Sequence, residues 1–193
     1  MRSRWRRLRQ SPTSHRVGYP KRVNTNASGA TIRRATTADI RPIQALIEPL
    51  VHRRILLGKE LVMLFEAVQE FVVAEDSTGS VVGCGALHVF WEDLGEVRTL
   101  AVDPAWQHRG VGHEIVAELE KRATNLGLRQ VFCLTFEVEF FRGLGYQVVD
   151  EAIVDPDTYS ELVRSPDEGV AEFLDLARVK PNTLGNSRML KTL

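Results

Sequence analysis

The sequence contains no apolar run long enough to cross a membrane. A membrane-spanning helix needs about 20 consecutive apolar residues, and the apolar runs here are far shorter, although 44% of the 193 residues are hydrophobic. Hydrophobic and charged residues occur in the proportions of an ordinary globular protein. The composition therefore argues against a membrane-embedded helix, and we expect no membrane partner.

Cysteine is scarce, and the two cysteines stand far apart. Cys84 and Cys133 both lie in strand-like apolar runs, and the chain has neither a C-x-x-C motif nor a Cys/His spacing typical of zinc sites. We therefore expect two buried, reduced thiols, no metal centre and a cytoplasmic protein.

Acidic residues are absent from the first 30 positions. This segment carries eight basic residues, which are Arg2, Arg4, Arg6, Arg7, Arg9, Arg16, Lys21 and Arg22. It has no apolar periodicity, and no apolar region follows the arginines as in a secretory signal, so residues 1–30 are predicted to be a disordered basic extension. Three interpretations stay open: a solvated arm with no specific task, an upstream-extended start whose true start lies near Val17 or Val23, and a targeting or nucleic-acid-binding arm.

Residues 31–193 are acidic overall and are predicted to form one domain. The whole chain has 25 basic and 25 acidic residues, so the part beyond residue 30 has a net charge of about −8. An acidic surface repels a phosphate backbone, and we therefore predict that nucleic acid is not a partner of this domain.

Hydrophobic patterning divides this domain into strands and helices. Helices are predicted where apolar residues recur every three to four positions, over residues 40–50, 59–69, 110–126, 137–144 and 157–164. Strands are predicted in β-rich runs over residues 32–35, 71–75, 81–90, 97–102, 131–134 and 146–149, and strand-like runs recur in the tail, residues 171–193. The early strands suit antiparallel hairpins and the later β-α-β-α-β order suits parallel pairing. This order predicts an α/β domain with a mixed sheet and helices on both faces.

The stretch of residues 94–112 combines a strand, a sharp break and a glycine-punctuated loop. It reads L-G-E-V-R-T-L-A-V-D-P-A-W-Q-H-R-G-V-G, and a helix is predicted to begin near Gly110. Free backbone N–H groups at a helix N-terminus attract phosphate. The spacing Gln107-x-x-Gly110-x-Gly112 differs from both the dinucleotide-binding G-x-G-x-x-G and the P-loop, so we expect a phosphate-binding loop of another class.

A second motif, about thirty residues later, supports a family resemblance. Residues 140–146 read F-F-R-G-L-G-Y and are similar to the F-Y-x-x-x-G-F segment of the GNAT superfamily of N-acetyltransferases, whose acetyl-CoA loop the Gln107-x-x-Gly110-x-Gly112 motif resembles. The resemblance implies the GNAT acyltransferase fold, with a mixed, mostly antiparallel central sheet, and acetyl-CoA as co-substrate.

A narrower resemblance points to the N-acetylglutamate synthases. It rests on V-G-C-G-A-L at residues 82–87, the pair Leu134-Thr135, and N-S-R-M-L at residues 186–190. The chain looks most like the short actinobacterial form, which consists of the acetyltransferase domain alone. This resemblance implies transfer of an acetyl group to the α-amine of L-glutamate or L-glutamine, the first step of arginine biosynthesis.

The family resemblance also implies which residues hold acetyl-CoA. Backbone N–H groups at the helix start would bind the pyrophosphate, and the preceding strand would pair with pantetheine and polarise the thioester carbonyl. The loop positions are Gln107, His108, Arg109, Gly110, Val111 and Gly112, and the strand positions are Leu100, Ala101 and Val102.

Glu96 matches the position at which several GNAT enzymes place a general base. Strand alternation predicts that Glu96, Arg98 and Leu100 share one face, and a carboxylate beside a low-dielectric cleft can accept a proton. The alternative is a purely structural pair between Glu96 and Arg98. Many relatives place a tyrosine general acid where this chain has Phe141, so the acid stays unassigned, and Tyr146 is expected in the core.

An amino-acid substrate needs cationic or donor groups for its carboxylates. The resemblance to the longer synthases favours Lys59, on a basic loop, and Ser187, in the N-S-R run, and Arg98 is a third candidate. The alternative for each is a solvated surface position. Where those relatives are basic, this chain has Asp93 and Glu137, which favours a neutral amide side chain such as that of glutamine.

Two other functions remain compatible with the sequence. One is a GNAT enzyme that acetylates another small amine or a protein N-terminus. The other is a non-catalytic regulator that binds acetyl-CoA, which the absence of a tyrosine at Phe141 favours. The sequence leaves the oligomeric state open, a homodimer included.

Overall fold

The computed structural model describes residues 27–149, 154–174 and 185–193. They form a seven-stranded sheet with the order β1-β2-β3-β4-β5-β7-β6. The strands are β1 Thr31–Arg34, β2 Phe71–Glu75, β3 Val81–Val89, β4 Leu94–Val102, β5 Gln130–Thr135, β6 Gln147–Val148 and β7 Ser187–Thr192. Only β4 and β5 pair in parallel, and the other neighbouring pairs are antiparallel. The predicted mixed sheet is confirmed.

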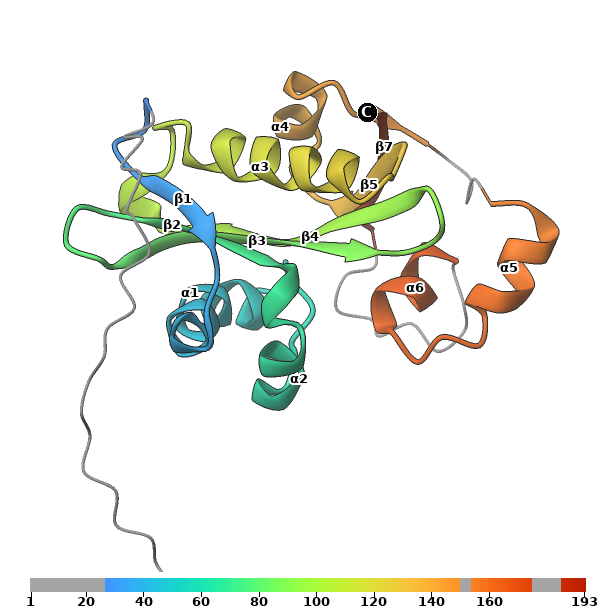
Figure 1. Ribbon diagram of the computed structural model, residues 1–193, viewed down its shortest axis with the longest axis horizontal. Helices are drawn as coiled ribbons and strands as arrows, with labels where there is room; N and C mark the ends of the chain where they lie inside the picture. The colour runs from blue at the N-terminus through green and yellow to red at the C-terminus, as the bar shows by residue number, and fades with distance from the viewer. Residues whose placement is uncertain (1–26, 150–153, 175–184) are drawn as a thin grey trace, which may run out of the picture.

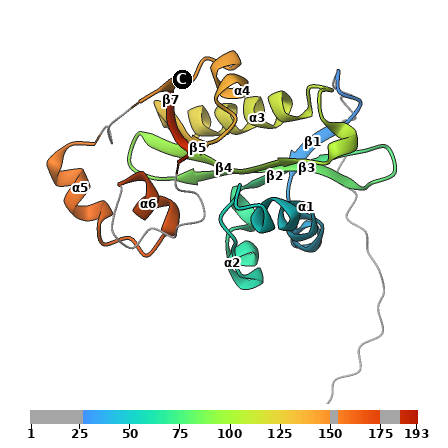
Figure 2. The ribbon, with the colours of Figure 1, turned by 180° about the vertical axis from the view of Figure 1, so that it is seen from behind.

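Helices cover both faces of this sheet, as predicted. They are α1 Ile40–His52, α2 Leu61–Glu66, α3 Val111–Asn125, α4 Val138–Gly143, α5 Pro156–Leu162 and α6 Glu168–Phe173. Helices α3 and α4 lie on one face, and α1 and α2 lie on the other (Figure 1). Viewed from behind, α5 and α6 stand together near the hairpin at which β4 begins (Figure 2).

The long helix α3 forms the centre of the core. Its buried residues follow the helical period, and the helix packs on β2, β3 and β4; the buried residues are Val111, Ile115, Val116, Leu119 and Ala123. The contact is close because β3 presents Gly85 to it, where a Cβ atom would lie 2.7 Å from Ile115. Helix α1 covers the opposite face with Ile40, Ile43 and Ile47.

Gly85→Val should therefore destabilise the fold, because its side chain has to displace Ile115 and Leu119. Overpacking of this kind costs about 1–3 kcal/mol. Urea unfolding followed by circular dichroism measures the free energy of unfolding. Gly143→Ala is the matched control, since a Cβ atom there meets nothing within 4 Å, and equal free energies for the two variants would contradict this view of the α3 contact.

Segment α5–α6 is held to the sheet by a smaller apolar cluster. Leu162, Val170 and Leu174 pack with Phe90, Leu94 and Phe132, and the rings of Phe90 and Phe132 meet edge to face with centroids 4.9 Å apart. This packing places the turn before α6 against β4.

The sequence prediction differs from the structure in two elements after β5. The parallel pairing expected of β6 is wrong, because β7 lies between β5 and β6 and pairs antiparallel with both. All six residues of β7 pair with β5. The pairing joins segments far apart in the chain, so no local sequence pattern predicts it. Helix α6 was not predicted, and the helix expected over residues 59–69 is the shorter α2 followed by the 3-10 turn Val68–Glu70.

The packed body begins slightly before Thr31. The backbone N–H and hydroxyl of Ser28 both donate to the Glu114 carboxylate, and Ala30 is fully buried. Residues 1–26 of the predicted extension (residues 1–30) and residues 175–184 of the tail (residues 171–193) lie outside the described residues. Within the described residues, no helix is long and apolar enough to span a membrane. Cys84 and Cys133 are buried and free of disulfides, as predicted.

Candidate active site

Strand β4 has an open backbone edge beyond Glu96. Its parallel pairing with β5 covers only residues 94–96, which lie opposite residues 130–132, whereas β3 stays paired to β4 as far as Val102. From Val97 onward, no described strand pairs with the β5-facing edge. Unpaired N–H and C=O groups there can pair with an extended ligand, as in strand addition.

A β-bulge at Thr99 interrupts β4 beside this open edge. Ala86 pairs with Arg98 and Cys84 pairs with Ala101, so two residues of β4 oppose one residue of β3. Thr99 has φ 55°, a conformation that is rare for a β-branched residue. The bulge re-aims the chain at a position where a ligand can approach it.

The bulge corrects one prediction about this strand. Glu96 and Arg98 share a face, as strand alternation predicts, and both line a cavity. Leu100 does not share that face, because the extra residue at the bulge reverses the alternation and turns Leu100 towards the core under α3. Ala101 instead faces the core under α1.

The cavity has a volume of about 260 Å³ and lies between the loop before α2, β4 and the turn before α6. It brings together three residues predicted from the sequence, Lys59, Glu96 and Arg98. Residues that the sequence did not indicate also line it, including Thr99, Asp167 and Asn186.

Glu96 is the most deeply buried carboxylate of the cavity, with 4% of its surface exposed. Among the described residues, its Oε2 atom accepts no hydrogen bond, and its distance to Arg98 Nη1 is 3.6 Å. Burial raises the pKa of Glu96, and the nearby Arg98 only partly offsets this rise. A carboxylate with a raised pKa and an oxygen without a hydrogen bond is suited to act as a general base.

Arg98 is committed to carboxylates of the protein itself. Its Nη2 donates to Glu70 Oε2 over 2.8 Å, and its Nη1 donates to Asp167 Oδ2 over 3.0 Å. Glu70 is in turn bonded through its other oxygen to His88 Nδ1 over 2.9 Å. The guanidinium, predicted as a substrate contact, is thus already surrounded by Glu70, Asp167 and Glu96.

Lys59 contributes the second cation of the cavity. Among the described residues it has neither a hydrogen bond nor an ion pair within 4 Å. Burial lowers the pKa of Lys59, and Arg98 lowers it further, whereas Asp167 and Glu96 act in the opposite direction. Its ammonium group is therefore free to meet an anionic group of a ligand.

Ser187 lies on the wrong face of its strand for the predicted role. It pairs with Thr135, and two residues on, Met189 pairs with Cys133 in the core under α3. Because side chains alternate along a strand, the residue before Ser187 is the one that reaches the cavity, and Asn186 is found in its lining. The prediction missed by one residue.

The loop between β4 and α3 has the geometry of an anion site. His108 (φ 61°) and Gly110 (φ 88°) are both left-handed, and α3 begins at Val111 with its first backbone bond running from Glu114 N–H to Gly110 C=O. The preceding N–H groups at the positive end of this 15-residue helix therefore have no intrahelical partner.

Side chains hold this loop in place. The Gln107 side chain donates to the carbonyl oxygen of Val102 over 3.3 Å, and the Arg109 guanidinium lies 4.9 Å from the centre of the Trp106 ring. Gly112 packs against the ring of Phe140, which a Cβ atom at this position would approach to 3.2 Å.

Phe141, which stands where many relatives have a tyrosine acid, and Tyr146 are both in the core. Phe141 and Tyr146 are almost fully buried, and their rings meet edge to face at 5.1 Å. The prediction that Tyr146 is a core residue is confirmed. Among the described residues, no three His, Cys, Asp or Glu side chains are grouped so as to hold a metal ion.

Comparison with known proteins decides the family. The Acetyltransferase (GNAT) family profile matches residues 44–146. An amino-acid acetyltransferase of Mycobacterium tuberculosis is 55% identical over 164 residues, which cover 84% of this chain and 94% of the relative. The chain belongs to the GNAT acetyltransferase family.

Solved structures support the same assignment. The crystal structure of Mycobacterium tuberculosis Rv2747 in complex with CoA and NLQ superposes with a TM-score of 0.81 at 55% identity, covering 84% of this chain and 99% of that one. The N-acetylglutamate synthase of Neisseria gonorrhoeae, complexed with CoA and N-acetyl-glutamate, gives a TM-score of 0.68 at 28% identity. This chain spans only 35% of the length of that synthase.

These comparisons confirm the GNAT fold and the enzyme class predicted from the sequence. As a GNAT acetyltransferase, the chain uses acetyl-CoA as the acetyl donor. The open edge of β4 and the loop before α3 can hold an extended, phosphorylated ligand, and β4 also lines the cavity that contains Glu96.

Proposed function

We propose that this GNAT enzyme transfers the acetyl group of acetyl-CoA to the α-amine of L-glutamine or L-glutamate, as at the first step of arginine biosynthesis. The amino-acid relatives support the substrate class. The observation that carries the proposal is the charge pattern of the cavity, where Lys59, unpaired within the described part of the chain, lies beside the buried carboxylate of Glu96. Lys59 would bind the substrate α-carboxylate, and Glu96 would accept a proton from the α-ammonium group.

The same charges favour glutamine over glutamate. A second carboxylate on the substrate needs a second cation, and Arg98 already has Glu70, Asp167 and Glu96 around it. Because an uncompensated charge is costly to bury, a neutral amide fits this cavity better. Asn186 also lines the cavity, and its side-chain amide is of a type that pairs with another amide.

The protein groups can perform the transfer in a simple sequence. The backbone of Leu100, Ala101 and Val102 would pair with the pantetheine arm, and N–H groups of residues 107–112 would bind the pyrophosphate. Glu96 takes the proton, directly or through water, and the free amine attacks the thioester carbonyl. The tetrahedral intermediate collapses with loss of the CoA thiolate, and the proton still on the nitrogen passes to solvent. A thiol pKa of about 8.5 allows the thiolate to leave without a dedicated acid, which Phe141 could not supply.

A panel assay tests the proposal against its rivals. The full chain is mixed with acetyl-CoA and single L-amino acids, other small amines or peptides with free N-termini, and thiol release is followed with a chromogenic disulfide. Release with glutamine or glutamate is expected. Release only with peptides or other amines would show that the substrate is not an amino acid. Release with none of them would favour a non-catalytic acetyl-CoA binder.

Lys59→Met should raise the KM for the amino acid by about tenfold or more, because the lost ion pair involves a partly desolvated charge. The KM for acetyl-CoA should change little. Initial rates with each substrate varied in turn separate the two effects. The control is Lys121→Met, an exposed lysine on α3, and equal amino-acid KM values for the two variants would remove Lys59 from the substrate site.

The cellular setting and assembly stay predictions. We place the reaction in the cytoplasm, in keeping with the two buried thiols. Analytical ultracentrifugation can measure whether the enzyme is a homodimer.

A further inference from the structure

The guanidinium of Arg98 is shared unequally among three carboxylates. It is hydrogen-bonded to Glu70 at 2.8 Å and to Asp167 at 3.0 Å, but its distance to Glu96 is 3.6 Å. Hydrogen bonds between charged N–H and carboxylate groups normally measure about 2.7–2.9 Å. Arg98 is therefore not hydrogen-bonded to Glu96, the carboxylate that lies on its own strand.

The two carboxylates that accept hydrogen bonds from Arg98, those of Asp167 and Glu70, are held in place by further hydrogen bonds. Asp167 Oδ1 accepts the backbone N–H groups of Gly169 (2.8 Å) and Val170 (3.2 Å), so only its Oδ2 atom faces Arg98. Glu70 is bonded to His88, and its own carbonyl oxygen accepts a hydrogen bond from Arg122 over 2.9 Å. Neither carboxylate can follow Arg98 if the guanidinium moves towards Glu96.

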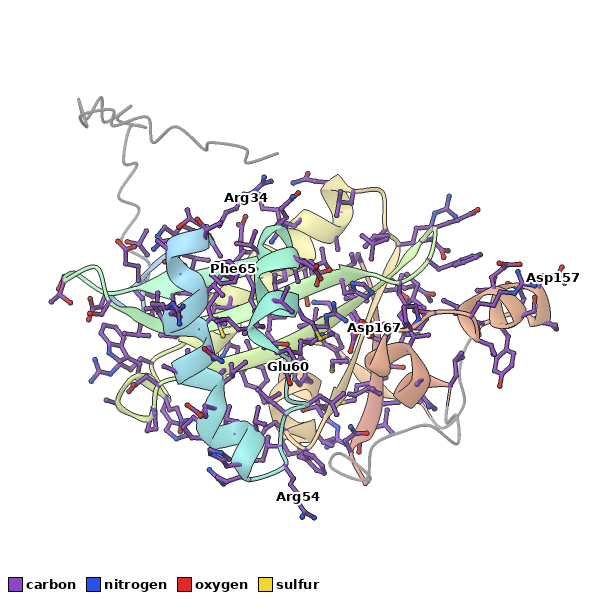
Figure 3. All side chains as sticks on the ribbon, turned by 90° about the horizontal axis from the view of Figure 1, so that it is seen from below. Arg34, Arg54, Glu60, Phe65, Asp157 and Asp167 are labelled. Carbon is purple, nitrogen blue, oxygen red and sulfur yellow. The ribbon has the colours of Figure 1, made fainter. Side chains whose placement is uncertain are left out.

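The turn that carries Asp167 also covers the Glu96 carboxylate. A Cβ atom at Gly169 would lie 3.1 Å from Glu96 Oε2 and 3.0 Å from Asp167 Oδ1. Figure 3 shows Asp167 at the inner end of α6, against the strands, while Asp157 lies at the outer end of α5. A side chain at this position would crowd both carboxylates, so Gly169 lets the turn lie close to Glu96.

We propose that Asp167, assisted by Glu70, is a positioning residue for the general base: it holds the Arg98 guanidinium away from Glu96, so that one oxygen of Glu96 stays free to accept the proton of the substrate amine. This inference rests on the proposed role of Glu96 as the base. Asp167 touches neither the reacting atoms nor the proton, and acts through Arg98.

Each charged group around Glu96 either favours or opposes ionisation of its carboxyl group. Arg98 from β4, His88 from β3 and Lys59 from the loop before α2 favour ionised Glu96, whereas Asp167 opposes ionisation. Cys133 from β5 also lies within electrostatic range. Loss of the Asp167 charge and closer approach of Arg98 would both make Glu96 a weaker base, so the two consequences of neutralising Asp167 cannot cancel.

Asp167→Asn isolates this effect. An asparagine can keep its oxygen on the N–H groups of Gly169 and Val170, but its NH₂ group cannot accept the bond from Arg98. The pH dependence of kcat, at saturating acetyl-CoA and glutamine, should show its acid limb shifted to lower pH by about one unit or more, with a lower plateau. The control is Asp157→Asn, exposed on α5, whose profile should match that of the parent.

The outcomes distinguish a failure of the positioning role of Asp167 from a failure of the base role of Glu96. If Glu96→Gln removes the acid limb and Asp167→Asn leaves it in place, the positioning role is overturned and the base is retained. If Glu96→Gln leaves the limb in place, the base assignment itself fails. Should Asp167→Asn unfold, Glu70→Met removes the other hydrogen-bond acceptor of Arg98 and is expected to shift the limb in the same direction; an unmoved limb in that variant overturns the inference.

Discussion

Glu96→Gln should lower kcat by about 100-fold or more, the usual contribution of a positioned general base. The amide has the size of the carboxylate but cannot take a proton. The parent enzyme should lose activity as the pH falls through the raised pKa of Glu96, and this acid limb should be absent from the residual activity of the variant. A pH series of kcat from pH 5 to 9 measures both.

The same substitution should make the folded protein more stable at alkaline pH. Burial raises the pKa of Glu96 above its usual range, so the native state binds this proton more tightly than the unfolded state does. The Glu96 contribution to stability therefore falls as the pH rises from about 4.3, the ordinary glutamate value, through the raised pKa. Glutamine removes this cost, and thermal unfolding at pH 8 should show a higher Tm.

Glu139→Gln is the matched control for both measurements, because Glu139 is an exposed residue of α4. It should change neither kcat nor Tm appreciably. A Glu96→Gln enzyme that keeps the parent kcat and acid limb would contradict the base assignment and leave Glu96 with only a structural contact to Arg98.

The second large effect is expected at Gly112. Gly112→Asp would place a negative charge in the first turn of α3, where the backbone N–H groups are expected to bind the acetyl-CoA pyrophosphate. The Kd for acetyl-CoA, measured by calorimetry, should rise by about 100-fold or to the point where no binding is detected, because a like charge opposes the phosphates at close range.

Gly112→Asn separates charge from size. Both side chains must displace the Phe140 ring, which lies 3.2 Å from the position of an added Cβ atom. The asparagine variant reports that steric cost alone, and acetyl-CoA should bind to it clearly more tightly than to the aspartate variant. Equal affinities would show that packing against Phe140, and not the phosphate charge, is what Gly112 provides.

Local features of this chain could be predicted because their causes lie within a few residues. The Asp103-Pro104 pair ends β4 because proline cannot continue the strand pairing. The glycine-containing loop that follows adopts a left-handed turn, and α3 begins directly after it. The apolar period of α3 likewise predicted its buried face. The prediction of Glu96 as the base came from the family resemblance, and its place in β4 brought it to the cavity.

The rest of the site depends on contacts between distant segments. The bulge at Thr99 exists only in relation to its partner strand β3, so strict alternation misplaced Leu100. The register of β7 against β5 decides that Asn186 and not Ser187 faces the cavity. Asp167 reaches Arg98 only because α6 packs on Phe132. These relations are set by tertiary packing, which a single sequence does not display.

A competition experiment tests the central claim most directly. The full chain is given acetyl-CoA with equal concentrations of L-glutamine and L-glutamate, and the N-acetylated products are measured by mass spectrometry over time. The account predicts acetylated amino acid with the glutamine product in clear excess, and loss of both products in Glu96→Gln. Absence of either acetylated product from the parent enzyme, or an excess of the glutamate product, would contradict it.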